Sequence, residues 1–173
     1  MYKICKTERS MERQKLFQTT LFSMMEQLSY HDITVTALTK EMKIPRKTFY
    51  RYYDALEDVL FATIDESITS SFLYLEVKAD LDGFFSYWKK NKYLLDVLEK
   101  NGLSPLLINR IYEKFDRRLE EEKSGKRIIS NKDLKYSGYI AAIMTMLVSW
   151  HHSGMHQTPN EMSTLVREMF RID

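Results

Sequence analysis

Apolar residues recur every three or four positions along most of the chain, which is the spacing that places side chains on one face of an α-helix. The first apolar stripe predicts a helix over about residues 8–29 and comprises Phe17, Leu21, Met24, Met25 and Leu28. A shorter stripe predicts a second helix, with Thr34 as its N-cap, and comprises Val35, Leu38 and Met42. The strict alternation that is typical of half-buried strands is rare, so the pattern favours a helical protein.

A third, longer stripe predicts a helix that runs from Leu56 to about Leu75. Asp54 and Glu57 stand three residues apart at its start, which is the spacing of a capping box. In that arrangement Asp54 accepts a hydrogen bond from the first turn and Glu57 accepts one from the N-cap amide.

The three prolines and two of the five glycines mark further helix ends. Ser104-Pro105 and Thr158-Pro159 pair a capping hydroxyl with a proline at the first helical position, and Pro45 opens the segment 45–53. Thr158 and Glu161 have capping-box spacing, and Gly102 and Gly154 follow helical runs as C-terminal caps do. The polar segment 120–131 predicts a loop, after which Ser130 caps a helix over about 131–153. The chain is therefore predicted to be all-α, with about nine helices.

The segment from Thr34 to Tyr53 predicts two short helices joined by a tight turn. Phe49 and Tyr53 are four residues apart and face a small core, whereas Arg46, Lys47, Tyr50 and Arg51 are left to face outward. Residues 43–51 contain four cations and no acid, although the whole chain has a net charge of only +2. Residues 1–60 carry 10 basic and 8 acidic residues, and residues 61–173 carry 16 of each, so the basic excess belongs to the N-terminal part.

This arrangement indicates a helix-turn-helix that binds double-stranded DNA. Such motifs place the start of the second helix in the major groove, and Arg46, Lys47 and Thr48 occupy that position. Cations bind phosphates, and side-chain donors on the same helix face contact base edges. The alternative from charge alone is a solvated basic surface. In the N-terminal arm, Glu8 and Glu12 interleave with a set of cations, which favours a solvated helix face over a groove contact; the cations are Lys3, Lys6, Arg9 and Arg13.

The amino-acid sequence of this segment resembles the DNA-binding signature of TetR/AcrR-type bacterial regulators. The resemblance covers about residues 13–66 and is carried by Ile33-Thr34-Val35, Leu38, Ile44, the run Thr48 to Tyr53, and Leu56 to Leu60. It implies a three-helix DNA-binding domain (1–53), a connecting helix (54–76) and a helical effector-binding and dimerisation domain (77–173). It also implies a dimeric repressor that a small hydrophobic ligand releases from DNA.

When this sequence is matched to the family's pattern position by position, the resemblance implies that Arg46 and Lys47 contact base edges. It also implies that Thr36 faces the groove. Tyr50 and Tyr52 match positions that meet the phosphate backbone. Lys40 is a candidate phosphate contact on charge alone, and Thr48 and Arg51 complete the expected DNA-binding set.

Four positions depart from the pattern of that family. Lys43 stands where a turn glycine is usual and must adopt a left-handed conformation at some cost. Pro45 replaces a capping serine, Thr39 replaces a smaller residue, and Leu56 replaces a frequent lysine. These changes concern operator affinity more than the fold. They leave open a second hypothesis, an all-α ligand-binding or protein-interaction co-regulator with weak or lost DNA binding.

The C-terminal part is rich in large apolar side chains, which serve either a helical core or a ligand pocket. The candidate pocket residues are Phe84, Trp88, Tyr112, Phe115, Met144 and Trp150. The helix over 134–153 is apolar nearly all round and so needs cover on more than one side. Together with the last helix it predicts a four-helix interface between two copies of the chain, for which the candidate residues are Tyr139, Ile143, Met146, Leu147, Trp150, Leu165 and Met169.

The remaining candidate chemistry is metal binding and catalysis. His152 and His156 have the spacing of two zinc ligands on a helix, but Gly154 lies between them, so a helix terminus that favours cationic histidines is the better interpretation. The single cysteine, Cys5, excludes an intrachain disulfide, and the sequence has no phosphate-binding glycine loop, Gly-x-Ser-x-Gly or HExxH motif. We expect no enzyme activity, cofactor, metal site or signal peptide. We also expect no membrane association, and therefore a soluble, cytoplasmic protein.

Overall fold

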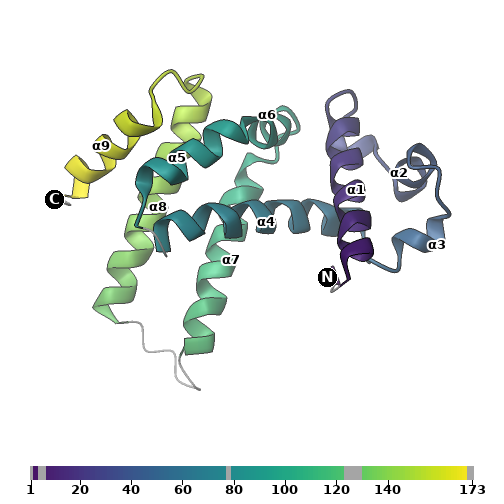
Figure 1. The fold of residues 1–173 in the computed structure, drawn as a ribbon, viewed down its shortest axis with the longest axis horizontal. Helices are drawn as coiled ribbons and strands as arrows, with labels where there is room; N and C mark the ends of the chain where they lie inside the picture. The colour runs from purple at the N-terminus through teal and green to yellow at the C-terminus, as the bar shows by residue number, and fades with distance from the viewer. Residues whose placement is uncertain (1, 4–6, 77–78, 123–129, 171–173) are drawn as a thin grey trace. The chain divides into compact units, whose positions relative to one another are not determined.

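The computed structural model describes residues 2–3, 7–76, 79–122 and 130–170, except for the side chains of 115–122 and 132. These residues form nine α-helices and one 3₁₀ turn and contain no strand, which confirms the predicted all-α class. The helices, shown in Figure 1, are α1 (Glu8–Met25), α2 (Val35–Glu41), α3 (Arg46–Phe49), α4 (Leu56–Glu76), α5 (Leu81–Lys90), α6 (Lys92–Lys100), α7 (Ser104–Glu122), α8 (Asn131–His152) and α9 (Pro159–Phe170). Among the helices of this part of the chain, none has both the length and the apolar character that a membrane span requires.

The chain forms two compact units. Unit 1 consists of Met1–Ser67 and Asp96–Ser104, and unit 2 consists of Ile68–Leu95 and Pro105–Asp173. The division falls inside α4 and inside α6, so both helices begin in one unit and end in the other.

Unit 1 is built around a cluster of aromatic rings. Phe17 of α1 meets Phe49 and Tyr53 edge to face, with ring centroids 5.5 and 5.7 Å apart. All three side chains are fully buried, which confirms that Phe49 and Tyr53 belong to the core. Edge-to-face contacts add a favourable quadrupole term to the burial of apolar area. The cluster therefore fixes α1 to the segment that carries α3.

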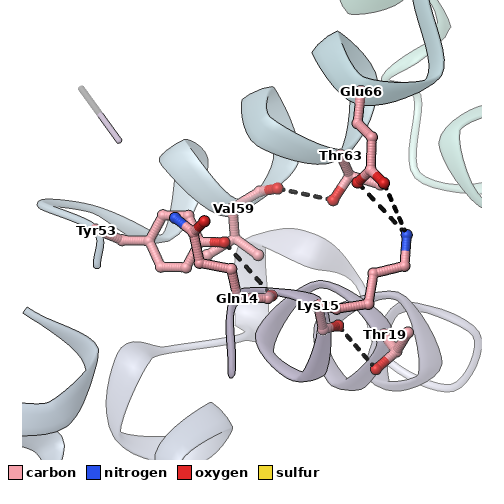
Figure 2. Close-up of polar contacts among 7 residues, drawn as sticks. All are labelled: Gln14, Lys15, Thr19, Tyr53, Val59, Thr63 and Glu66. Atoms are coloured by element: carbon pink, nitrogen blue, oxygen red, sulfur yellow. Dashed lines mark hydrogen bonds and ion pairs between the residues drawn. The ribbon is translucent and has the colours of Figure 1, made fainter. Parts of the chain in front are cut away.

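Polar contacts join α1 to α4 and to the end of the α3 segment (Figure 2). Lys15 Nζ lies 3.3 Å from Glu66 Oε1, and the Tyr53 hydroxyl donates a long hydrogen bond of 3.5 Å to the carbonyl oxygen of Gln14. Both ends of the Lys15–Glu66 pair are about half exposed, so this surface pair contributes little to the free energy of folding. The buried rings, rather than the ion pair, hold these elements together.

The helix starts follow the predicted caps with two corrections, of which the first is that α7 begins at Ser104 itself rather than at Pro105. The Thr34 hydroxyl accepts from the amide of Ala37, and Thr158 and Glu161 form the expected reciprocal pair at α9. The amide and the hydroxyl of Thr158 both donate to Glu161 Oε2, and these two hydrogen bonds hold the pKa of Glu161 below its usual value. At α4 the returning acceptor is Asp58 rather than Glu57, since the amides of Asp54 and Ala55 both donate to Asp58 Oδ2. The helix begins at Leu56 as predicted, so its third residue is Asp58, whereas the capping-box pattern gave that position to Glu57.

The helix ends are partly as predicted. Gly102 and Gly154 adopt φ values of 68° and 88°, the left-handed conformation expected of C-terminal caps. Ser130 caps α8 in a capping box with Asp133. The first helix ends at Met25, earlier than predicted, and Leu28 is exposed rather than part of its buried stripe. The helix α7 continues to Glu122, which shortens the predicted loop; residues 123–129 lie outside the described part of the chain.

Unit 2 has a second aromatic core, formed mainly by α5 and α8. Phe85 of α5 meets Trp150 of α8 edge to face, with ring centroids 5.6 Å apart. Phe84 and Trp88 are fully buried beside them, and α5 also packs along α9. The start of α5 is fixed by Asp80, whose side chain accepts a hydrogen bond of 2.8 Å from the amide of Gly83.

Two helical glycines of unit 2 differ in the space around them, which gives a matched test of this packing. We expect Gly83→Ala to lower the free energy of unfolding by about 1–3 kcal/mol, because its Cβ would lie 2.3 Å from both Tyr74 Cδ1 and Asp80 Oδ2. A Cβ added at Gly138 would meet nothing within 4 Å. Gly138→Ala should therefore raise the free energy of unfolding by about 0.5–1 kcal/mol, because alanine has the higher helix propensity. Chemical denaturation of both variants checks the prediction, and equal shifts of the same sign would contradict it.

Candidate functional site

The two short helices of unit 1 are joined by a turn whose backbone is held by a Schellman motif. The amide of Ile44 donates to the carbonyl oxygen of Thr39, and the amide of Lys43 donates to that of Lys40, both at 3.0 Å. Lys43 lies between them with φ of 53°, which confirms the left-handed conformation expected at this position. The turn is thus formed without the glycine that this geometry favours, at a cost in strain.

Replacing Lys43 with glycine should remove that strain. We expect Lys43→Gly to raise the free energy of unfolding of unit 1 by roughly 1 kcal/mol, since glycine adopts positive φ without a Cβ penalty. Urea denaturation followed by circular dichroism would measure the shift. A lower stability than that of the wild type would show that the turn carries no strain at Lys43.

The helix α3 has only four residues and presents a basic face. It starts after Pro45, whose carbonyl oxygen accepts from the amide of Thr48 at 2.8 Å, and it gives way to a turn at Tyr50. This is shorter than the predicted segment 45–53, whose last residues are turns. Phe49 points into the core, and the exposed side chains are Arg46, Lys47, Tyr50 and Arg51, as the sequence predicted.

Arg46 and Tyr50 form a local pair on the exposed face. Arg46 Nη2 and Nε donate to the Tyr50 hydroxyl oxygen at 2.8 and 3.2 Å. The guanidinium carbon also lies 5.5 Å from the centre of the Tyr50 ring, within the range of a cation–π contact. The tyrosine therefore limits the rotamers of Arg46 and holds its charge at the surface.

The remaining candidate residues surround this face. Thr36 and Lys40 are exposed and lie four residues apart on α2, so they share one side of that helix. Thr48 and Tyr52 are half-buried, and the Tyr52 ring lies 5.8 Å from Phe17. Lys3 approaches the same segment: its amide donates to the carbonyl oxygen of Tyr52, and its Nζ donates to that of Tyr50.

The electrostatics of this face are simple. Four cations lie in the stretch 43–51, and within the described residues none of them forms an ion pair. Elsewhere in unit 1, burial raises the pKa of Tyr30 to about 12, with the Glu57 and Asp58 carboxylates adding to the effect. Burial also disfavours the ionised form of Asp58, but accepted hydrogen bonds, including those from Ala55 and Asp54, outweigh it and lower the pKa of that carboxyl.

Comparison with protein families identifies the other half of the chain. A TetR-type family model, described as a transcriptional regulator C-terminal region, matches residues 77–171, which is more than half of the sequence. The chain belongs to the TetR family of transcriptional regulators. No curated protein and no solved structure matches it. The family match lies outside the segment that carries the helix-turn-helix resemblance, so the two lines of evidence are independent.

In this TetR-family regulator, the candidate pocket residues do not all lie together. Phe84, Trp88 and Trp150 are fully buried in the core of unit 2. Tyr112 and Met144 instead line a cavity of about 40 Å³ between α7 and α8, together with Ile108, Ile111, Ser137, Ile140, Ala141 and Thr145. The side chain of Phe115 lies outside the described residues. The cavity holds a few water molecules at most and is far smaller than a typical small-molecule site of about 300–1,000 Å³.

The candidate dimer residues divide into three groups by burial. Ile143, Leu147 and Trp150 are already buried within their own chain, so they have no surface to bury against a second copy. Leu165 and Met169 are 45% and 51% exposed on α9. The other two candidates, Tyr139 and Met146, are half-buried.

Tyr139 of α8 packs against α9. Its ring packs on Phe170 at a centroid distance of 5.0 Å. Burial raises the pKa of the Tyr139 hydroxyl, and the positive charge of Arg167 partly offsets the rise.

The histidines near the end of α8 do not share one helix face. The helix ends at His152, and Gly154 adopts positive φ, so His156 lies beyond the helix. His151 is buried, whereas His152 and His156 are exposed. The spacing of His152 and His156 thus loses the helical geometry that two zinc ligands would need. Cys5 and Lys6 lie outside the described residues.

The role of Asn101, the residue before the helix-ending Gly102, was not predicted from the sequence. Asn101 Oδ1 accepts from the amide of Tyr30 at 2.8 Å, and its Nδ2 donates to the carbonyl oxygen of Met25 at 3.2 Å. Lys100 Nζ also donates to the carbonyl oxygen of Glu26. The end of α6 therefore satisfies carbonyl groups at the end of α1, and no local pattern signals a contact between residues so far apart.

Proposed function

We propose that this TetR-family regulator is a sequence-specific DNA-binding repressor that binds a palindromic operator as a homodimer. The observation that carries the proposal is the exposed face of α3, on which Arg46 and Lys47 stand at the start of the helix while Phe49 anchors it from behind. A helix placed in this way can enter the major groove with its N-terminal residues toward the base edges. Arg46 is suited to a bidentate contact with guanine, and Lys47 to a base or a phosphate.

The second short helix and the turn residues support the same role. Thr36 and Lys40 present a hydroxyl and an ammonium group on one side of α2. Tyr50, Arg51 and Tyr52 are part of the recognition segment, which comprises residues 43–53. Contacts from such residues to phosphates fix the register of a protein on the duplex. The cations without ion-pair partners are expected to release counterions from DNA, which makes binding strongly dependent on salt.

Dimerisation is supported by the exposed face of α8. The helix has no charged residue between Lys135 and His151, and Gly138, Thr145 and Ser149 are exposed along one side of it. Leu134 extends this side with 56% exposure. Small, uncharged residues allow a second helix to approach closely, and the exposed Leu165 and Met169 of α9 offer further apolar area. The interface we propose therefore uses the outer faces of α8 and α9 rather than the buried Ile143, Leu147 and Trp150.

A hydrophobic effector could act through unit 2. The small cavity between α7 and α8 would have to open, with Tyr112 and Met144 as the lining residues that move. The helix α6 begins in unit 2 and ends in unit 1, where Asn101 binds the end of α1. We propose that a displacement of α6 on effector binding would reach the recognition segment through this contact, and that release from DNA follows from differential affinity for the two states.

Selection of bound duplexes from a random pool tests the DNA-binding part of the proposal. The purified protein should enrich a palindrome whose half-sites lie about one helical turn apart, because the two recognition helices of a dimer face the same side of the duplex. Enrichment of no common sequence, combined with no retention of DNA at low salt, would instead favour a co-regulator without DNA binding.

The oligomeric state gives a separate prediction. Light scattering of the purified protein at micromolar concentration should give twice the mass of one chain, because the outer faces of α8 and α9 remain uncovered in the single copy. The mass of a single chain at that concentration would refute the dimer.

A further inference from the structure

A basic groove lies between the first turns of α1 and the segment that carries α3. It has a volume of about 450 Å³, and its charged lining consists of Arg9, Arg13 and Arg51. Arg9 and Arg13 come from successive turns of α1, and Arg51 follows α3. The groove therefore gathers cations from two elements that are about forty residues apart in the sequence.

Uncompensated positive charge distinguishes this groove. Within the described residues none of the three guanidinium groups has an ion-pair partner. The two carboxylates that alternate with the arginines along the chain, Glu8 and Glu12, do not line it. The sequence pattern suggested a solvated face of mixed charge, but the helix turns the arginines to the groove and leaves the carboxylates elsewhere.

The groove also supplies neutral hydrogen-bond donors. Thr48 and Tyr52 line it beside Arg51, and in the described part of the chain neither hydroxyl has a hydrogen-bond partner. The hydroxyls of Thr7 and Ser10 lie 2.7 Å apart and are engaged with each other in the cap of α1. Guanidinium forks and free hydroxyls together match the oxygens of a phosphodiester, which is singly charged and accepts several hydrogen bonds.

We infer that this groove binds a phosphodiester of the DNA backbone beside the bases that α3 contacts, with Arg9 and Arg13 as the phosphate ligands from α1. The inference rests on the proposed function, because it extends the same DNA-binding surface. Thr48 and Arg51 belong both to the groove and to the recognition segment, so the two surfaces are continuous. A contact of this kind adds affinity and fixes register without adding sequence preference.

The test is DNA binding by the double variant Arg9→Ala/Arg13→Ala, measured by fluorescence anisotropy over a range of salt concentrations. Each protein is titrated with the duplex that the wild type selects and with a scrambled duplex. We expect roughly a tenfold weaker affinity for both duplexes, and a plot of log K against log salt that is shallower by about 1–2, since each lost phosphate contact removes about one released counterion. The ratio of the two affinities should stay at the wild-type value.

Two further variants make the test specific. Lys15→Ala removes from the same helix a cation that pairs with Glu66 (Figure 2). Lys15 does not line the groove, so this variant should leave both affinity and slope unchanged. Arg9→Lys/Arg13→Lys keeps the charge and should restore most of the salt slope. Circular dichroism melting of each variant confirms that the fold is retained.

The outcomes separate the inference from the proposed function. If the wild type binds the selected duplex and Arg9→Ala/Arg13→Ala binds it with an unchanged slope, the groove is not a phosphate site, while the DNA-binding function stands. If the double variant loses only its preference for the selected duplex, the arginines contact bases instead, which also overturns the inference. If the wild type binds no DNA, both the proposed function and the inference fail.

Discussion

Phe49→Ala is expected to destabilise unit 1 by about 3–5 kcal/mol and to abolish DNA binding. Phe49 is fully buried, and its ring meets those of Phe17, Tyr50 and Tyr53 at centroid distances of 5.4–5.6 Å. Truncation removes these contacts and leaves a cavity behind the four-residue helix α3, which has too few internal hydrogen bonds to persist alone. Chemical denaturation of the variant, compared with the wild type, measures the loss.

Phe49→Leu is the matched control for this prediction. Leucine keeps most of the apolar volume, so it should cost less than half as much as alanine and should retain DNA binding. A cost below about 1 kcal/mol for Phe49→Ala would contradict the structure, because a fully buried ring cannot be removed from a packed core so cheaply.

Arg46→Ala/Lys47→Ala is expected to abolish the preference for the selected operator while leaving the fold intact. A bidentate base contact is worth about 1–3 kcal/mol of discrimination, so the affinity ratio between selected and scrambled duplexes should fall by about 5–150-fold for each base contact that the two substitutions remove. Both residues are exposed, and the contact between Arg46 and Tyr50 is confined to the surface. Competition binding with the two duplexes measures the ratio.

The matched control here is Arg46→Lys/Lys47→Arg, which keeps the total charge but exchanges the two donor geometries. It should retain binding to any duplex and lose much of the preference, because lysine lacks the planar fork that arginine presents. A variant Arg46→Ala/Lys47→Ala with the wild-type ratio would show that α3 does not read the base edges.

The recognition segment was the part most accessible to sequence reasoning. Phe49 and Tyr53 are spaced so that both face inward, and the core positions they occupy are fully buried. The left-handed conformation of Lys43 was implied by the resemblance to TetR/AcrR-type regulators, which usually have glycine at this turn position, and the observed φ agrees. Such local features depend on neighbours within a few residues, which the sequence displays directly.

Features that depend on distant residues were not accessible in this way. The groove of Arg9, Arg13 and Arg51 exists only because α1 packs beside the α3 segment, and the sequence shows only arginines alternating with glutamates. The contact of Asn101 with Met25 likewise joins residues from separate helices. Periodicity also identified α8 as apolar nearly all round, but it could not say that Ile143, Leu147 and Trp150 are covered by their own chain.

At the start of α4, the sequence predicted the helix but not which residue caps it. Asp54, Glu57 and Asp58 all stand near the predicted helix start, and the choice of capping residue depends on which residue begins the helix. The returning hydrogen bond is accepted by Asp58, one position later than Glu57. The boundary of a helix is therefore harder to predict than its presence.

The salt dependence of DNA binding by the wild-type protein tests the central claim most directly. Anisotropy titrations of the selected duplex should give log K that falls linearly with log salt, with a slope of about −0.9 for each phosphate contacted and so several units in total. The scrambled duplex should be bound more weakly at every salt concentration. No retention of either duplex at low salt, or an affinity that does not change with salt, would contradict the assignment of unit 1 as a DNA-binding domain.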